Sequence, residues 1–115
     1  MGQAFTPELA VDVLRGVIVS LVRKDGPALS SHQLGVYLTC YLKDGDHTVR
    51  GLARELGVSK SVITRALDRL SELQLAARKT DPEDRRSVIV QRTDVGLEML
   101  EELQKIAGAA IEGRA

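Results

Sequence analysis

Residues 48–70, TVRGLARELGVSKSVITRALDRL, constrain the fold more than any other part of the sequence. Thr48 is a good N-cap for a short helix with apolar residues at helical spacing, and Gly57 is a good C-cap for the same helix. Ser59, two residues later, is an N-cap for a second, longer amphipathic helix. Two helices joined by a turn of three or four residues form a helix-turn-helix unit. The segment therefore predicts this unit.

The second helix of the unit has an apolar face and a polar face. The face expected to pack on the core carries the apolar residues Ile63, Ala66, Leu67 and Leu70. The opposite face carries Lys60, Ser61, Thr64, Arg65 and Asp68. Small hydroxyl side chains let the start of a helix approach phosphates and base edges, and an arginine bonds bidentately to guanine. This face fits a DNA recognition helix; the alternative is an amphipathic helix whose polar side only meets water.

A hairpin is predicted after this helix, over residues 77–80 and the β-branched run 87–91. Arg85 and Arg86 lie at its tip, where two adjacent cations gain nothing structurally from each other. Phosphates or a narrow minor groove would attract such a pair. The same turn contains two aspartates, Asp81 and Asp84. They leave two interpretations open: a salt-bridged turn with no partner, or acids that hold the arginines extended before binding.

Further helices are predicted on both sides of this region. Thr6 as N-cap and Pro7 at the first helical position start a helix over about residues 7–23, and a buried helix follows over about 31–43. Thr93 caps a last helix. Apolar residues cover about half the circumference of the first and last helices, which is wider than the roughly 100° stripe that one core requires. A second packing partner for these helices is therefore expected.

Charge and composition exclude several classes of protein. The 115 residues carry 16 basic and 16 acidic side chains, but residues 50–92 hold ten Lys/Arg against six Asp/Glu, which leaves +4 there and −4 elsewhere. This asymmetry suits one basic face turned toward an anionic partner. One cysteine and two histidines give neither a disulfide framework nor a zinc cluster, so no metal and no cofactor are expected. No catalytic motif is present, and an enzyme is not expected.

No apolar stretch approaches the roughly 18 residues that span a membrane. The acids Glu8 and Asp12 interrupt the apolar block that a secretory signal would need near the first residues. A cytoplasmic protein is expected.

The run LARELGVSKSVITRALDRLSELQLAARKTDPEDRRSVIVQRTDVG resembles the helix-turn-helix and wing of the MarR (multiple antibiotic resistance regulator) family. The resemblance covers roughly residues 48–100 and includes the acid-rich turn, the arginine pair, the Thr cap and Gly96. It implies a mainly α fold with a small β-hairpin, forming a single winged-helix domain over 1–115. Residues 48–93 would be the helix-turn-helix and wing, and 1–30 and 94–115 the dimerisation helices.

The resemblance also implies a homodimer that binds double-stranded DNA at a pseudo-palindromic operator. The residues placed in the major groove would be Ser59, Lys60, Ser61, Thr64 and Arg65. Arg85 and Arg86 would form the tip of the wing, which enters the minor groove in this family, and Arg69 would contact a phosphate. The chain departs from the family at Gln74, where a glycine usually ends the recognition helix, and at Arg92, where an apolar residue usually closes the second wing strand. It also has one C-terminal helix where full-length members commonly have two.

Members of the family often bind small aromatic or phenolic effectors, and Tyr37 and Tyr41 on the predicted buried helix are the candidate ligand contacts. Buried helices also contain tyrosines simply as packing residues. Cys40 has a redox interpretation, but free cysteines are commonly buried and nothing basic is adjacent to lower its pKa.

Two functions follow. The first is a sequence-specific DNA-binding regulator, a repressor acting as a homodimer. The alternative, motivated by the net charge of zero, is a winged-helix module that binds another protein and not DNA.

Overall fold

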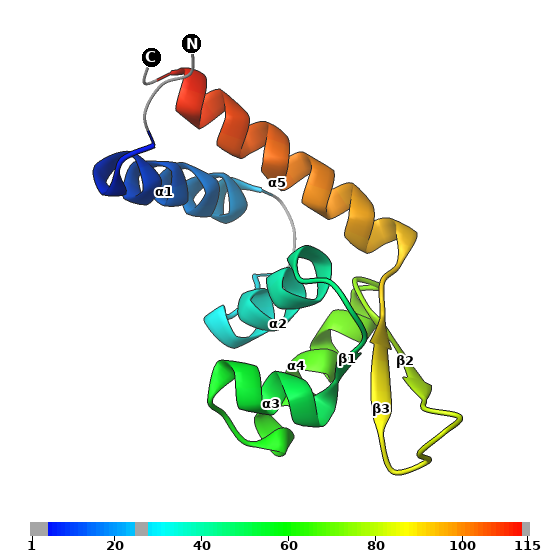
Figure 1. Ribbon diagram of the computed structural model, residues 1–115. Coiled ribbons are helices and arrows are strands. Elements are labelled where there is room, and N and C mark those ends of the chain that lie inside the picture. Colours follow the sequence, from blue (N-terminus) through cyan, green and yellow to red (C-terminus); the bar gives the residue numbers. More distant parts are fainter. Residues whose placement is uncertain (1–4, 25–27, 114–115) are drawn as a thin grey trace. The chain divides into compact units, whose positions relative to one another are not determined.

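The computed structural model describes residues 5–24 and 28–113. They belong to two compact units: Leu29–Glu98, and Met1–Ala28 together with Met99–Ala115. In chain order the elements are α1 (Pro7–Arg23), α2 (Ser31–Leu42), β1 (His47–Thr48), α3 (Val49–Leu56), α4 (Lys60–Glu72), β2 (Ala77–Thr80), β3 (Val88–Gln91) and α5 (Asp94–Glu112) (Figure 1). The predicted mainly helical fold with a small hairpin is confirmed.

The predicted helix starts are confirmed by hydrogen bonds between capping side chains and the backbone. The hydroxyl of Thr6 accepts from Leu9 N at 3.1 Å, and that of Thr48 accepts from Gly51 N at 2.9 Å. Thr93 accepts from Gly96 N at 2.9 Å. Each bond satisfies an amide that the first turn of a helix leaves without an intrahelical acceptor.

The sheet has three antiparallel strands in the order β1-β3-β2. In the hairpin, Ala77 pairs with Gln91 and Thr80 pairs with Val88. The pairing of β1 with β3, which places Thr48 opposite Ile89, was not predicted from the sequence. β1 has only two residues, too few for a strand pattern to be visible. It ties the start of α3 to the hairpin.

Three helices of the Leu29–Glu98 unit supply most of its core. The side chains that are almost fully enclosed are Val36, Tyr37, Leu52, Ile63, Leu67 and Leu70. They come from α2, α3 and α4, and the apolar face predicted for α4 is buried in full. The prediction that α2 is a buried central helix is confirmed by the burial of Val36, Tyr37, Cys40 and Tyr41.

Gln74 takes the left-handed conformation, with φ 62°, one residue after the C-cap Leu73 of α4. Its amide donates to Ser71 O at 3.0 Å, and the Leu75 amide donates to Leu70 O at 2.8 Å. This is a Schellman motif, in which glycine is the usual left-handed residue. The chain therefore keeps the geometry of the family's glycine at the cost of roughly 1 kcal/mol of backbone strain.

Arg92, the other departure, closes the end of α2. Its guanidinium donates to Cys40 O at 2.9 Å and to Lys43 O at 3.2 Å, and lies 5.8 Å from the centre of the Tyr41 ring. A cation at this position satisfies free carbonyls and interacts favourably with the negative end of the helix dipole.

In the other unit, α1 packs on the later turns of α5. A side chain on Gly16 would meet Ala110 Cβ at 3.4 Å, so the two helices approach closely there. Lys24 and Glu102 form an ion pair at 2.6 Å. Leu9 and Val13 are buried. Within residues 5–24 and 28–113, no helix has the length and apolar character needed to span a membrane.

Gly96 and Gly108, both on α5, give a matched test of packing. A Cβ on Gly96 would overlap the Tyr41 hydroxyl and ring and lie 2.8 Å from Leu75 O, whereas a Cβ on Gly108 meets nothing within 4 Å. We expect Gly96→Ala to lower the free energy of unfolding by roughly 1–3 kcal/mol through overpacking. Gly108→Ala should raise it by about 0.5–1 kcal/mol, because alanine loses less conformational entropy in a helix. Urea denaturation followed by circular dichroism measures both values, and equal effects would contradict the packing described for Gly96.

Candidate nucleic-acid interface

The exposed face of α4 begins at its N-cap. The Ser59 hydroxyl accepts from Val62 N at 3.3 Å and lies 3.0 Å from the Ser61 hydroxyl. The residues that α4 turns toward solvent are Lys60, Ser61, Thr64, Arg65 and Asp68, as expected from its periodicity. The start of the helix therefore combines free amide groups, hydroxyls and two cations on one exposed surface, an arrangement that suits an anion.

Two of the basic residues near this face are engaged with acids of the same chain. Arg69 pairs with Glu72 at 3.1 Å along α4. Arg78 of β2 pairs with Asp68 of α4 at 2.7 Å. The second pair connects the base of the hairpin to α4. Lys60 and Arg65 make no ion pair within the described residues, and their charges face solvent.

The aspartates of the hairpin turn bond mainly to the backbone. Asp81 Oδ1 accepts from Glu83 N at 2.9 Å, and Asp84 Oδ1 accepts from Arg86 N at 3.1 Å. These bonds shape the turn in the way that aspartates commonly do. The Arg86 guanidinium lies 3.7 Å from Asp84 and its side chain is 92% exposed, so this ion pair restrains it little. The Arg85 side chain is exposed and has no ionic partner in the part of the chain that the structure describes.

Three further cations share this unit. Arg50 and Arg54 lie one helical turn apart on α3, and Lys79 lies on β2. All three are exposed and form no ion pair among the described residues. They belong to the +4 segment of residues 50–92, but no role was predicted for them. Arg69 and Arg78 differ from them, because their charges are neutralised by Glu72 and Asp68.

The two candidate ligand contacts, Tyr37 and Tyr41, are 1% and 6% exposed. Their hydroxyls donate to Gly96 O at 2.6 Å and Leu75 O at 2.7 Å. A surface depression at the base of the hairpin is lined by Cys40, His47 and Arg92 among others, and by neither tyrosine. Contact of Tyr37 and Tyr41 with an effector stays a prediction, and the structure gives both a packing role.

Cys40 is buried, and burial raises the pKa of its thiol to about 11, with a smaller opposing effect from the Arg92 charge. A thiol with a raised pKa holds little of the reactive thiolate at neutral pH. No group of three or more potential metal ligands is found among residues 5–24 and 28–113.

The geometry defines a class of protein: a helix-turn-helix followed by a hairpin wing, with exposed cations on both, is a winged helix-turn-helix DNA-binding unit. Residues 41–87 match the family profile described as MarR family. No curated protein matches the chain.

Several solved structures share the fold. Transcriptional regulator Tm0710 from Thermotoga maritima is 25% identical with a TM-score of 0.73, and the match covers 92% of this chain and 69% of that one. YusO from Bacillus subtilis is 26% identical with a TM-score of 0.68, covering 93% and 70%. The transcriptional repressor CouR, solved bound to a 23-mer DNA duplex, is 25% identical with a TM-score of 0.68, covering 93% and 70%.

The chain is similar to MarR-family regulators over residues 41–87, and solved winged helix-turn-helix transcriptional regulators share its fold. The resemblance seen in the sequence is confirmed, and the base and phosphate contacts of individual side chains stay predictions.

The raised pKa of Cys40 leads to a labelling prediction. At pH 8 the thiolate fraction of the folded protein should be roughly 100-fold below that of the unfolded chain, because the pKa rises from 9.0 to about 11. Ellman's reagent should therefore label Cys40 at least that much more slowly in buffer than in guanidinium chloride. Since the folded-state pKa is the higher one, this group's contribution to stability is complete below pH 9 and is lost as the pH rises toward 11. Equal labelling rates in the two solvents would show that Cys40 is not enclosed.

Proposed function

We propose that this chain is a repressor that binds a pseudo-palindromic DNA operator as a homodimer and blocks access to a promoter. The observation that carries the proposal is that α4 and the wing both expose cations that form no ion pair among the described residues, Lys60 and Arg65 on one and Arg85 on the other. The solved complex of CouR with a duplex supports the same use of the fold. Because DNA is the partner, the proposed place of action is the cytoplasm.

The recognition helix α4 would read the major groove. Ser59, Ser61 and Thr64 are short enough to let it approach the bases, and Arg65 is placed to bond to a guanine. Lys60 would contact a phosphate beside the helix start. Arg69 would also contact a phosphate, once its ion pair with Glu72 is broken. Breaking it costs little, because the pair is exposed and such pairs contribute about 0–1 kcal/mol.

The wing would follow the adjacent minor groove with Arg85 and Arg86. Their backbone is shaped by Asp81 and Asp84, while their guanidiniums are free to reach outward. A narrow minor groove concentrates negative potential and attracts arginine in particular. The ion pair between Arg78 and Asp68 would connect the wing to α4 during binding.

The homodimer would form through α1 and α5. Val11, Leu14, Ile18 and Val22 recur three or four residues apart on α1 and are 67%, 57%, 40% and 78% exposed. At about 100° per residue they form one stripe, on a different side from the buried Leu9 and Val13. Such a stripe of large apolar side chains marks an interface. A second copy of this chain would cover the stripe, and the two-fold symmetry of the resulting dimer would match that of a palindromic site.

The alternative function, a module that binds protein and not DNA, is favoured only by the net charge of zero. The two functions predict different dependences of binding affinity on salt concentration. Contacts with phosphates release counterions, so the logarithm of the affinity of a DNA-binding protein falls linearly with the logarithm of the salt concentration. Each phosphate contact adds about 0.9 to the steepness of this fall.

The first test of the proposal uses fluorescence anisotropy with a duplex obtained by binding-site selection. The wild type should lose affinity steeply with salt. Arg65→Ala should weaken binding to the selected duplex by about 1–3 kcal/mol. It should therefore reduce the difference in affinity between the selected duplex and unrelated duplexes. Arg85→Ala with Arg86→Ala should weaken all duplexes alike and reduce the salt slope by about 1–2. Lys105→Ala, an exposed cation of α5, is the control and should change neither quantity. Salt-independent binding, or no selected duplex, would contradict the proposal.

The second test concerns the dimer and uses sedimentation velocity. Leu14→Glu with Val22→Glu places two charges in the α1 stripe and should convert the dimer to a monomer with unchanged helical content. Arg23→Glu changes the net charge by the same two units outside the stripe and should leave the dimer intact. A wild type that sediments as a 12.5 kDa monomer would contradict this part of the proposal.

A further inference from the structure

Three segments that are far apart in the sequence meet in the core of the Leu29–Glu98 unit. They are Tyr37 and Tyr41 of α2, the turn at Gln74 and Leu75 that ends α4, and residues 93–96 at the start of α5. We call the three side chains and the glycine that join them, Tyr37, Tyr41, Thr93 and Gly96, the tyrosine clasp.

Tyr41 and Thr93 connect the end of α4 to the start of α5. The Tyr41 hydroxyl donates to Leu75 O at 2.7 Å and accepts from Thr93 N at 2.9 Å. The Thr93 hydroxyl donates to Gln74 O at 2.6 Å and accepts from Gly96 N at 2.9 Å. The two hydroxyls thus each bridge the turn after α4 and the first turn of α5.

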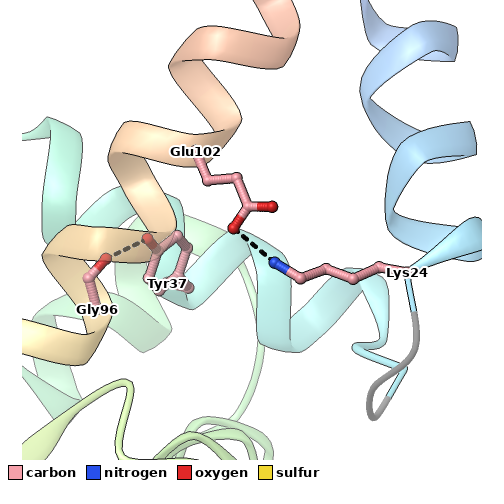
Figure 2. Close-up of polar contacts among 4 residues, drawn as sticks. All are labelled: Lys24, Tyr37, Gly96 and Glu102. Atoms are coloured by element: carbon pink, nitrogen blue, oxygen red, sulfur yellow. Dashed lines mark hydrogen bonds and ion pairs between the residues drawn. The ribbon is translucent and has the colours of Figure 1, made fainter.

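Tyr37 adds a third connection, because its hydroxyl donates to Gly96 O on α5 at 2.6 Å (Figure 2). The rings of Tyr37 and Tyr41 lie 4.6 Å apart between centroids. A Cβ at Gly96 would overlap Tyr41, so the first turn of α5 has no room to shift toward α2. Burial raises the pKa of the Tyr37 hydroxyl well above its ordinary value, so it remains a donor at physiological pH.

The helix that the clasp holds is shared by both units. α5 is continuous from Asp94 to Glu112, and its residues from Met99 onward belong with α1 to the unit that carries the proposed dimer interface. Along this route, the recognition helix and the dimer interface are linked through the first turn of α5. The direction of that turn relative to the end of α4 is fixed by hydrogen bonds to backbone carbonyls, which have defined geometry.

We propose that the tyrosine clasp sets the direction in which α5 leaves the DNA-binding unit, and thereby the spacing between half-sites that the dimer accepts. Tyr41 and Thr93 are positioning residues in this account, since they act on the recognition helix without reaching DNA. The inference depends on the proposed function, because spacing has meaning only for a dimer on two half-sites.

The test compares half-site binding with operator binding. Tyr41→Phe keeps the ring and removes the hydroxyl that bonds to Leu75 and Thr93. Thr39→Val is the matched control: it removes a hydroxyl from the same helix, one that bonds to Gly35 O at 2.7 Å and takes no part in the clasp. Each protein is titrated against a single half-site, the selected operator, and operators with one base pair added or removed between the half-sites.

For Tyr41→Phe we expect half-site affinity within about twofold of the wild type, operator affinity lower by roughly tenfold, and a smaller difference between the three spacings. Sedimentation should show an unchanged dimer, and Thr39→Val should behave as the wild type. A purely structural role would lower half-site and operator affinity alike, and that result would overturn the inference.

A second pair keeps the test decisive if Tyr41→Phe does not fold. Thr93→Ser retains the hydroxyl and should preserve the spacing preference, whereas Thr93→Val removes it and should weaken the preference. Equal spacing preference in both variants overturns the inference while leaving the proposed function intact. A wild-type dimer that binds operators of all three spacings with equal affinity also overturns the inference and leaves the proposed function intact. A wild type that binds no duplex instead contradicts the proposed function itself.

Discussion

Two phenol hydroxyls lie inside a core that otherwise contains apolar side chains, and their need for acceptors organises the DNA-binding unit. Leaving one unsatisfied would cost about 1–3 kcal/mol. Tyr37 and Tyr41 avoid this cost by bonding to the carbonyls of Gly96 and Leu75. These carbonyls stand on either side of the wing in the sequence, so the bonds join the end of the recognition helix to the start of α5.

The surface follows from this core. Because α4 buries its apolar face completely, its polar face points outward from the first turn. The Arg78–Asp68 pair then couples the wing to α4. Ion pairs within the unit neutralise some of its cations. The cations of α3, α4 and the wing that have no ionic partner in the described part of the chain produce the positive field that an anionic duplex would meet. A chain with no net charge can in this way present a basic surface.

The sequence predicted the features that depend on neighbouring residues. The caps at Thr6, Thr48 and Thr93 were predictable because each bond spans three residues, and the buried face of α4 because helical spacing determines it. β1 and the tyrosine clasp depend on contacts between distant segments, and no local pattern announces them. Gln74 and Arg92 were visible as departures from the family, but only the structure revealed a strained Schellman turn and a cap on α2. Contacts with bases depend on a second molecule and stay predictions.

In the proposed complex, α4 and the wing enter two different grooves of the same duplex. Dimethyl sulfate protection tests this arrangement directly, because the reagent methylates guanine N7 in the major groove and adenine N3 in the minor groove. The account predicts that the bound protein protects guanine N7 within each half-site and adenine N3 in the flanking sequence where the wing lies. Protection confined to one groove, or bound duplex that remains fully reactive in both, would contradict it.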